Sequence, residues 1–202
     1  QIFAFTAAPV TVFLSGIIGS QFSPVKSLAT LPMALSIVGI AIFAIFAAKV
    51  MSIIGRRAGF MFASVVSSLS SVLAAYSIII ESFILFNFSC FLLGAGVAFS
   101  HQYRFAAVET VKKDMAPKAI SIILLAGIGS AFIGPNVANI TKGFIAEHLY
   151  AGSYIALAAL TLTSTIFLLF YEDGHKPNHV NKKIKRSYLE LISQPRFLQA
   201  LV

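Results

Sequence analysis

Long apolar runs alternate with short polar joints along the whole chain. Six runs reach bilayer length, because about 20 apolar residues, at a rise of about 1.5 Å each, cross a hydrocarbon core of about 30 Å. They cover residues 2–19, 27–54, 58–80, 82 toward 109, 119–141 and 151–171. The runs are too long for strands and lack period-two alternation. The pattern predicts an all-α integral membrane protein with six transmembrane helices.

We expect the fourth span to continue past Ser100 without a helix breaker, through His101 and Arg104 toward Glu109.

Composition supports the membrane assignment. Of 202 residues, 58% are apolar and only 11% are charged, against about 25% charged in soluble domains. These values exclude a soluble domain, a disordered chain and a secreted disulfide scaffold.

The net charge of +8 does not indicate nucleic acid, since the basic residues cluster between apolar spans instead of on one polar face. We therefore expect no nucleic-acid partner. The single cysteine, Cys90, lies inside an apolar run, so it can form no disulfide or thiolate metal site within this chain. We expect no bound metal or cofactor.

The basic residues also predict the orientation of the spans. The joints after spans two, four and six carry Arg56, Arg57, Lys112, Lys113, Lys118, Lys176, Lys182, Lys183, Lys185 and Arg186. The other joints hold only Lys26 and Lys142. The positive-inside rule places the first set in the cytoplasm.

The domain organisation follows from this orientation. Residues 1–171 form a six-helix transmembrane unit, 172–195 a basic cytoplasmic linker, and 196–202 the start of a seventh helix. The linker is either an anionic-lipid contact or regulatory site, or only the solvated connection that topology requires.

The chain begins inside one apolar run and stops as another begins, so we expect a fragment. A signal peptide would need a charged start and a small-residue cleavage site, which the first run lacks.

Small residues recur four positions apart inside several spans. This spacing places them on one helix face, so that helix backbones can approach closely. The pairs are Ala44 with Ala48, Ser64 with Ser68, Ser67 with Ser71, Gly94 with Ala98, and Gly127 with Ala131. They predict a packed bundle.

The sequence contains no catalytic constellation. His-Glu-x-x-His, a phosphate-binding glycine loop and Gly-x-Ser-x-Gly are all missing, and the intramembrane His101 and Arg104 share one helix without a carboxylate or cysteine partner in a neighbouring span. The chain is therefore not expected to be an enzyme.

Three local patterns stand out instead. Gly55-Arg56-Arg57 occupies a very short turn, where glycine permits a tight bend and the guanidiniums can meet helix C-terminal carbonyls or acidic partners. Gly134-Pro135 lies inside span five, where proline kinks the helix and glycine leaves room for another helix or a ligand. The third pattern, in span four, is the stretch 94–98 followed by 103–107.

Together these patterns resemble the major facilitator superfamily, in particular the N-terminal six-helix half of a bacterial proton- or ion-coupled carrier. Gly55-Arg56-Arg57 looks like the end of the family's loop 2-3 signature. Gly94, Gly96 and Ala98 match the small residues of its span-four signature. Gly134-Pro135 resembles the span-five signature associated with drug antiporters.

The resemblance implies a twelve-span carrier whose two halves are each built from two inverted three-helix repeats around a central site. It implies that spans one and four line the cavity, two and five pack against the missing C-terminal half, and three and six face lipid. Span one carries Thr6, Pro9, Thr11 and Ser15, which suit a kinked cavity wall. Alternatively, these hydroxyls bond to their own helix backbone.

We therefore predict a secondary active transporter that moves a small organic solute by alternating access, coupled to protons or another ion, in a bacterial inner membrane. Its partners are the lipid bilayer, the solute and the missing half. The alternative is a non-transporting membrane receptor or assembly protein. Candidates for solute contact or coupling are Arg104, His101, Gln102, Asn136 and Asn139, and candidates for conformational change are Gly55, Arg56, Arg57, Gly134 and Pro135.

Arg104 has two interpretations. A charge well inside a span costs at least about 2.5 to 3.5 kcal/mol, so it usually faces a wet cavity or a partner. In the other interpretation span four ends near Ser100, and Arg104 extends its guanidinium to the cytoplasmic surface beside Glu109.

Overall fold

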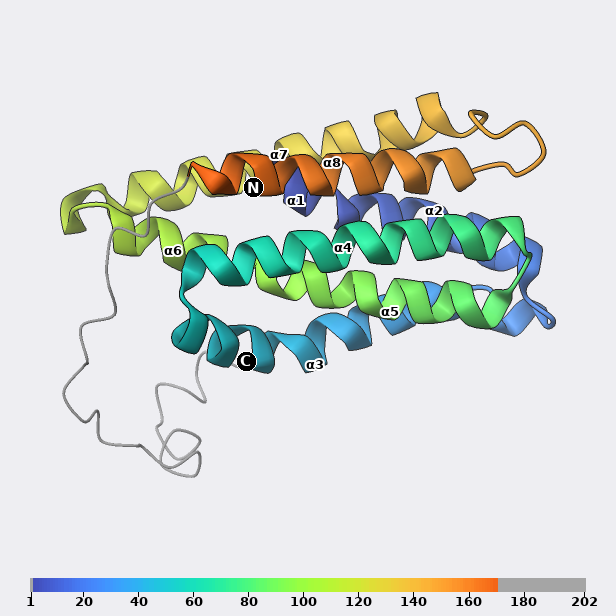
Figure 1. Ribbon diagram of the computed structural model, residues 1–202, viewed down its shortest axis with the longest axis horizontal. Helices are drawn as coiled ribbons and strands as arrows, with labels where there is room; N and C mark the ends of the chain where they lie inside the picture. Colours follow the sequence, from blue (N-terminus) through green and yellow to red (C-terminus); the bar gives the residue numbers. More distant parts are fainter. Residues whose placement is uncertain (1, 171–202) are drawn as a thin grey trace.

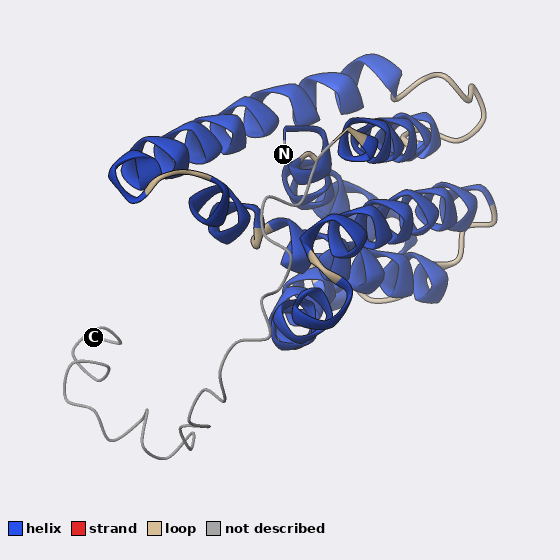
Figure 2. Cartoon of the chain, turned by 60° about the vertical axis from the view of Figure 1, so that its left-hand side comes forward, coloured by secondary structure: helices blue, strands red, loops and turns tan. Residues whose placement is uncertain are grey.

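The structure, a computed structural model, describes residues 2–170 of the chain as an elongated bundle of helices, with no strand among those residues (Figures 1 and 2). Six helical segments within this part are long and apolar enough to cross a membrane. The α-helices are α1 (Ile2–Phe5), α2 (Ala7–Phe22), α3 (Leu31–Ile54), α4 (Arg56–Ile79), α5 (Phe83–Ser100), α6 (Tyr103–Thr110), α7 (Ala116–Thr141) and α8 (Ala151–Leu169). Short 3₁₀ turns, η1 (Lys26–Leu28) and η2 (Lys113–Met115), precede α3 and α7.

The all-helical prediction and the six predicted spans are confirmed, with boundaries that differ by a few residues. The first turn of α4 includes Arg56 and Arg57, and α7 begins at Ala116, because Pro117 suits the start of a helix, where its missing N–H has no partner to lose. The predicted linker 172–195 and seventh helix 196–202 lie outside the described residues.

Span four continues past Ser100 as expected, from Phe83 to Thr110, but it is not one regular helix. It divides into α5 and α6 at His101 and Gln102. At this point the Gln102 N–H donates to the Phe99 carbonyl at 2.9 Å, three residues back, so the hydrogen-bond ladder tightens and ends. A new ladder begins when Ala106 N–H donates to the Gln102 carbonyl at 3.1 Å.

Span one is kinked as predicted, at Thr6 between α1 and α2. Pro9 explains the break, since its ring conflicts with the carbonyl four residues earlier. The Thr6 hydroxyl donates to the Phe3 carbonyl at 2.6 Å, which is the backbone bonding left open as the alternative.

The other polar residues of span one do not line an open wall. Thr11 and Ser15 are buried, whereas the exposed face of α2 presents Val12 and Phe13. The expectation of a polar cavity wall is therefore wrong for these two hydroxyls, because the helix turns them toward the interior of the bundle.

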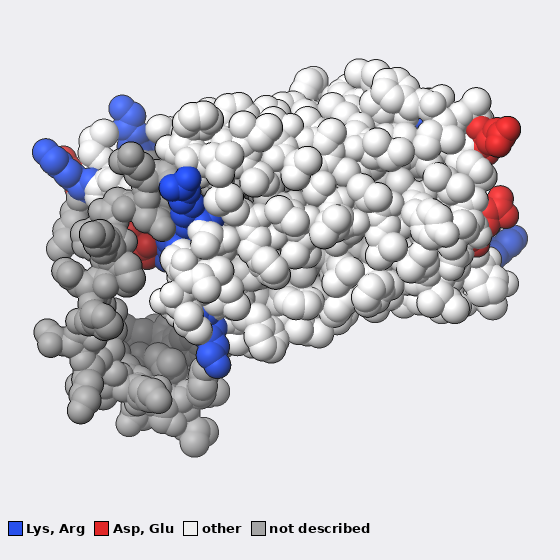
Figure 3. All heavy atoms as spheres, in the orientation of Figure 1, with Lys and Arg blue, Asp and Glu red and all other residues white. Residues whose placement is uncertain are grey.

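Charged side chains gather at the two ends of the bundle, and Figure 3 shows a broad band between them without visible charge. One end, where α3, α6 and α8 end and α4 and α7 begin (Figure 1), we call the basic end; by the helix bounds it carries Arg56, Arg57, Arg104, Lys112 and Lys118. Glu81, Glu147, Lys26 and Lys142 lie in or beside the connections α2–α3, α4–α5 and α7–α8, which are at the opposite end (Figure 1). This distribution is what a bilayer requires of a spanning bundle, since charges are costly in hydrocarbon.

Glycines allow the closest helix contacts. On α3 and α5, an added Cβ at Gly94 would collide with the Ser36 carbonyl, and one at Gly39 would collide with the Phe91 carbonyl. Gly96 of α5 makes a similar approach to Ser67 of α4. Such close contacts stabilise helix association by van der Waals packing. In a bilayer the hydrophobic effect does not favour contact between helices, because the lipid tails are themselves apolar.

Serine side chains join α4 to α8. The Ser64 hydroxyl donates to the Thr161 carbonyl, and the Ser68 hydroxyl donates to the Ala158 carbonyl at 3.1 Å. Both serines are buried, so these bonds satisfy hydroxyls that would otherwise be unpaired in an apolar interior.

Only part of the predicted small-residue spacing produces helix contacts within the described bundle. Ser64, Ser68, Ser67, Ser71, Gly94 and Ala98 are buried at helix interfaces. The pairs on α3 and α7 are not packed in this way: Ala48 and Ala131 are exposed, and an added Cβ at Gly127 would meet nothing within 4 Å.

The packing order agrees with two three-helix repeats. In the first repeat the three spans are α1–α2, α3 and α4; in the second they are α5–α6, α7 and α8. The middle span of each repeat packs on the first span of the other, since α3 contacts α5 and α7 contacts α2. A core centred on Leu14, Cys90, Leu93 and Tyr154 lies between the repeats.

Candidate functional site

Gly55 makes the connection between α3 and α4 with a single residue. Its φ of 87° lies in the left-handed region, which glycine enters without steric cost. The turn therefore places Arg56 and Arg57 directly in the first turn of α4, at the basic end. This confirms the tight bend predicted for Gly55.

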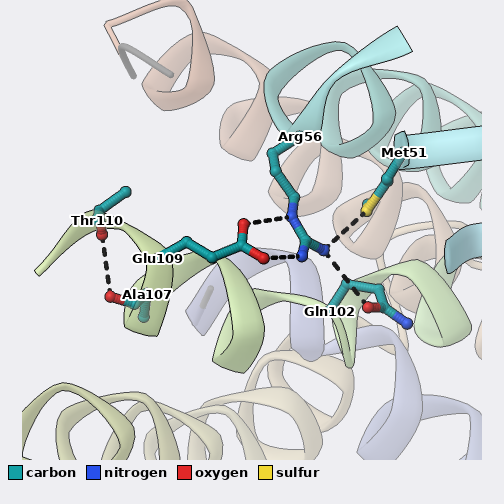
Figure 4. Close-up of polar contacts among 6 residues, drawn as sticks. All are labelled: Met51, Arg56, Gln102, Ala107, Glu109 and Thr110. Atoms are coloured by element: carbon teal, nitrogen blue, oxygen red, sulfur yellow. Dashed lines mark hydrogen bonds and ion pairs between the residues drawn. The ribbon is translucent and has the colours of Figure 1, made fainter. Parts of the chain in front are cut away.

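Arg56 forms a two-bond ion pair with Glu109 on α6 (Figure 4). Its Nη2 lies 2.6 Å from Oε1, and its Nε donates to Oε2 at 3.0 Å. The Arg56 side chain is 24% exposed and that of Glu109 is 54% exposed. A pair this open to solvent contributes about 0.2 to 1 kcal/mol, and its two-point geometry fixes orientation as well. Arg56 Nη1 also approaches Gln102 Oε1 at 3.5 Å.

Arg57 reaches a different helix. Its Nη2 donates to the Leu169 carbonyl at 2.5 Å, at the C-terminus of α8. A cation there pairs with unsatisfied carbonyls and with the negative end of the helix dipole. We call the set Arg56, Glu109, Arg57 and the Leu169 carbonyl the arginine clamp. Both predicted partner types, a carboxylate and a helix C-terminal carbonyl, are present in it.

Sequence reasoning did not pair Glu109 with Arg56. A usable signal was available, since Glu109 is the only acidic residue between Glu81 and Asp114 and lies near the end of span four. The clamp connects α4, in the first three-helix repeat, to α6 and α8, which belong to the second repeat.

A second close contact involves Gly134. An added Cβ would lie 3.1 Å from Pro9 Cγ and 3.2 Å from Val10 Cγ2, both on α2. Pro135 follows inside α7 and removes one backbone hydrogen bond there. The Gly-Pro step of span five therefore packs against the kinked part of span one, and the room that Gly134 leaves is taken by a helix.

The structure places the span-four candidates at the break between α5 and α6. The half-buried His101 packs edge-on against Phe5, with ring centroids 5.3 Å apart. Gln102 contacts Arg56 in the clamp. Arg104 is exposed in the first turn of α6 and has no hydrogen bond or ion pair with any residue that the structure describes.

The span-five candidates lie far from this group. The C-terminal end of α7 lies opposite to the basic end (Figure 1). Asn136 and Asn139 are exposed in its last two turns, where Asn136 donates to the Phe132 carbonyl at 2.7 Å and Asn139 accepts from Lys142 at 3.0 Å. The structure therefore does not bring the five candidates into one site within the described bundle.

A cavity of about 490 Å³ lies at the basic end. Its walls come from α1, α4, α6, α7 and α8. The lining residues are Ile2, Phe3, Phe60, Tyr103, Ala106, Ala107, Thr110, Ile123, Ser164, Phe167 and Leu168. No sequence pattern predicted it, because its residues come from five helices and become neighbours only through the fold.

Six apolar spans, charges gathered at the ends and two interlocked three-helix repeats define a polytopic helical membrane protein. The sequence profile of the Major Facilitator Superfamily matches residues 2–202. The chain belongs to this family, which confirms the resemblance carried by the glycine and arginine signatures.

Three relatives are similar to this chain over most of its length. The chain is 30% identical over 195 residues to a riboflavin transporter, RfnT, of Brucella anthropi, covering 96% of this chain and 49% of the relative. It is 27% identical to the uncharacterized MFS-type transporter YdeG of Bacillus subtilis, covering 83% and 40%, and 26% identical to YddS of the same organism, covering 85% and 40%. The chain thus spans at most about half the length of these relatives. No solved structure matches it at a significant level.

The ion pair of the arginine clamp can be tested by a double-mutant cycle. Arg56→Gln and Glu109→Gln should each lower thermal stability in detergent, and the double variant should lose less than the sum, with a coupling of about 0.2 to 1 kcal/mol. Lys26→Gln, which removes an exposed cation at the opposite end, is the control and should show no coupling to Glu109→Gln. Strictly additive effects of Arg56→Gln and Glu109→Gln would contradict the pair.

The contact at Gly134 can be tested by adding volume. Gly134→Leu should destabilise the protein by about 1 to 3 kcal/mol, since Pro9 and Val10 leave no room. Gly16→Leu is a control on α2, the helix that Gly134 contacts, where the new side chain enters open space. Thermal unfolding of the two variants should differ clearly; equal losses would show that the Gly134 contact is not tight.

Proposed function

We propose that this chain is part of a secondary active transporter that moves a small organic solute by alternating access. The observation that carries the proposal is the family match over residues 2–202, together with a fold of two interlocked three-helix repeats. Such repeats can rock around a site held between two halves of a carrier.

We propose further that α3 and α7 pack against a second six-helix half of the same protein. Only 17% of the most apolar stretch of the second span and 11% of that of the fifth are buried, against 44% to 67% in the other spans. The exposed face of α7 also carries Asn136 and Asn139. Amide side chains are costly against lipid and are better satisfied at a protein interface.

The basic end is proposed to face the cytoplasm of a bacterium, in the inner membrane. The support is the positive-inside rule applied to the basic residues of the joints, and the bacterial origin of the relatives. In this orientation the arginine clamp lies on the cytoplasmic side. We assign it a gating role: its ion pair holds α4 against α6 in one state and releases them in the other.

For the solute, the riboflavin transporter among the relatives supports a first candidate, riboflavin or a similar vitamin-sized compound. Arg104 is the proposed contact for a polar or anionic group of the solute, because its exposed guanidinium has no ion pair among the described residues. His101, one turn earlier in the chain, is proposed to couple proton movement, since histidine titrates near physiological pH. Gln102, Asn136 and Asn139 stay secondary candidates.

The direct test is solute flux into proteoliposomes that contain the full-length protein, driven by an imposed proton gradient. Saturable riboflavin uptake that collapses with the gradient is the expected result. Saturable uptake that is independent of every imposed ion gradient would contradict active transport. No flux of any vitamin tried would favour the alternative of a non-transporting receptor.

Arg104 variants refine this test. Arg104→Ala should leave membrane abundance nearly intact, since removing the charge relieves an insertion cost, and it should strongly reduce uptake. Arg104→Lys should restore little if the contact is a two-point guanidinium fork, and much if only charge is needed. Lys118→Ala is the control for loss of a cation at the same end. Uptake near wild type in both Arg104 variants, normalised to surface expression, would leave Arg104 as a surface anchor.

A further inference from the structure

The cavity at the basic end lies between helices and is partly open to the outside of the bundle. Five helices, α1, α4, α6, α7 and α8, contribute its walls, so it lies between them and not on one lipid-facing helix surface. Its volume of about 490 Å³ falls in the range of sites that hold vitamin-sized molecules, about 300 to 1,000 Å³. None of its residues was a predicted solute contact.

Four aromatic rings line the cavity, and they form two stacked pairs across helices. Phe60 of α4 and Tyr103 of α6 lie parallel, with centroids 4.0 Å apart and planes 4° apart. Phe3 of α1 and Phe167 of α8 are also nearly parallel, at 5.7 Å and 10°. Aromatic rings from four helices therefore surround one space, although each ring covers one face of its stacked partner and Phe60 is only 2% exposed.

The polar groups of the lining are neutral and already engaged. The Thr110 hydroxyl donates to the Ala107 carbonyl of its own helix at 3.0 Å (Figure 4). The Ser164 hydroxyl donates to the Thr161 carbonyl at 2.5 Å and lies 2.7 Å from Ser64 Oγ. No charged side chain is among the described residues of the wall. Ring stacking and apolar contact are therefore the main means of recognition that this wall offers.

We propose that this cavity is a binding subsite for a neutral, planar aromatic ring system, such as the ring portion of the transported solute. The proposal rests on the proposed function for the identity of the solute and for the choice of probe. A rigid planar ring gains offset or edge contacts with aromatic walls, each about 0.5 to 1.5 kcal/mol. A flexible acyl chain gains no such contacts and loses more conformational freedom on entry.

The cavity and the arginine clamp share a wall. Phe60 lies one turn after Arg56 on α4, and Tyr103 lies on the same short helix as Glu109. The ion pair that holds α6 against α4 therefore also holds the Phe60–Tyr103 stack together. Occupancy of the subsite is thus linked to the state of the clamp.

The test is fluorescence titration of riboflavin with the purified full-length protein. Lumiflavin, which has the same ring with a methyl group in place of the ribityl chain, should bind within a few-fold of riboflavin, and ribitol should not compete. Phe167→Leu should weaken binding of both flavins about twofold to tenfold, as expected for loss of one aromatic contact. Phe170→Leu, at an exposed ring outside the cavity, is the control and should bind as wild type.

A second pair of variants tests whether the flavin ring occupies the cavity. Ala107→Phe adds a ring inside the cavity and should block flavin binding, whereas Val108→Phe adds one at the next position, outside the lining. Circular dichroism and thermal unfolding check that each variant folds. Unchanged binding in folded Ala107→Phe and Phe167→Leu would overturn the subsite, as would displacement of riboflavin by decanoate with no binding of lumiflavin.

The two proposals fail differently. Flavin binding that depends on Phe167, without flux in proteoliposomes, would contradict transport and keep the aromatic subsite. Flavin flux with full activity in both cavity variants would keep transport and overturn the subsite.

Discussion

The hydrocarbon core of a bilayer offers no water to a backbone or to a charge, and the rest of this architecture depends on that restriction. Each span must satisfy its own backbone within a helix, so helices are the only elements among residues 2–170. Charged groups are moved to the two ends, which leaves the middle of the bundle nearly free of them (Figure 3). Helix association must then use close approach and hydroxyl bonds, as at Gly94 and Ser64.

The same restriction concentrates the chemistry at the basic end. Charges in the middle of the membrane are costly, so the charged contacts between the two repeats lie at the basic end. They are the ion pair of Arg56 with Glu109 and the hydrogen bond of Arg57 to the end of α8. Ion pairs that remain partly exposed are weak enough to open and close at small cost. This suits a gating role better than a deeply buried pair, which would resist separation.

Much of the fold could be predicted from the sequence, because span length and charge spacing are local properties of the chain. The six spans, the tight turn at Gly55 and the kink at Pro9 are of this kind. The break at His101 was only one of two alternatives, because no glycine or proline marks it. The burial of Thr11 and the open space beside Gly127 depend on which helix lies opposite, and a four-residue spacing does not specify a neighbour. The cavity could not be predicted for the same reason, since its walls come from helices that are far apart in the sequence. The family was predicted from signatures that stay together in the chain, whereas the five solute candidates were chosen by residue type and lie in two separated groups.

The account depends most on the orientation that places the arginine clamp in the cytoplasm. It can be measured by thiol labelling in intact cells, after Cys90→Ala removes the native thiol. Cysteines at Ala146 and Lys112, exposed at opposite ends of the bundle, are the two reporters. The positive-inside rule predicts that a membrane-impermeant maleimide labels Ala146→Cys in intact cells and Lys112→Cys only after permeabilisation. Labelling of Lys112→Cys in intact cells, with protection of Ala146→Cys, would place the clamp outside and contradict the account.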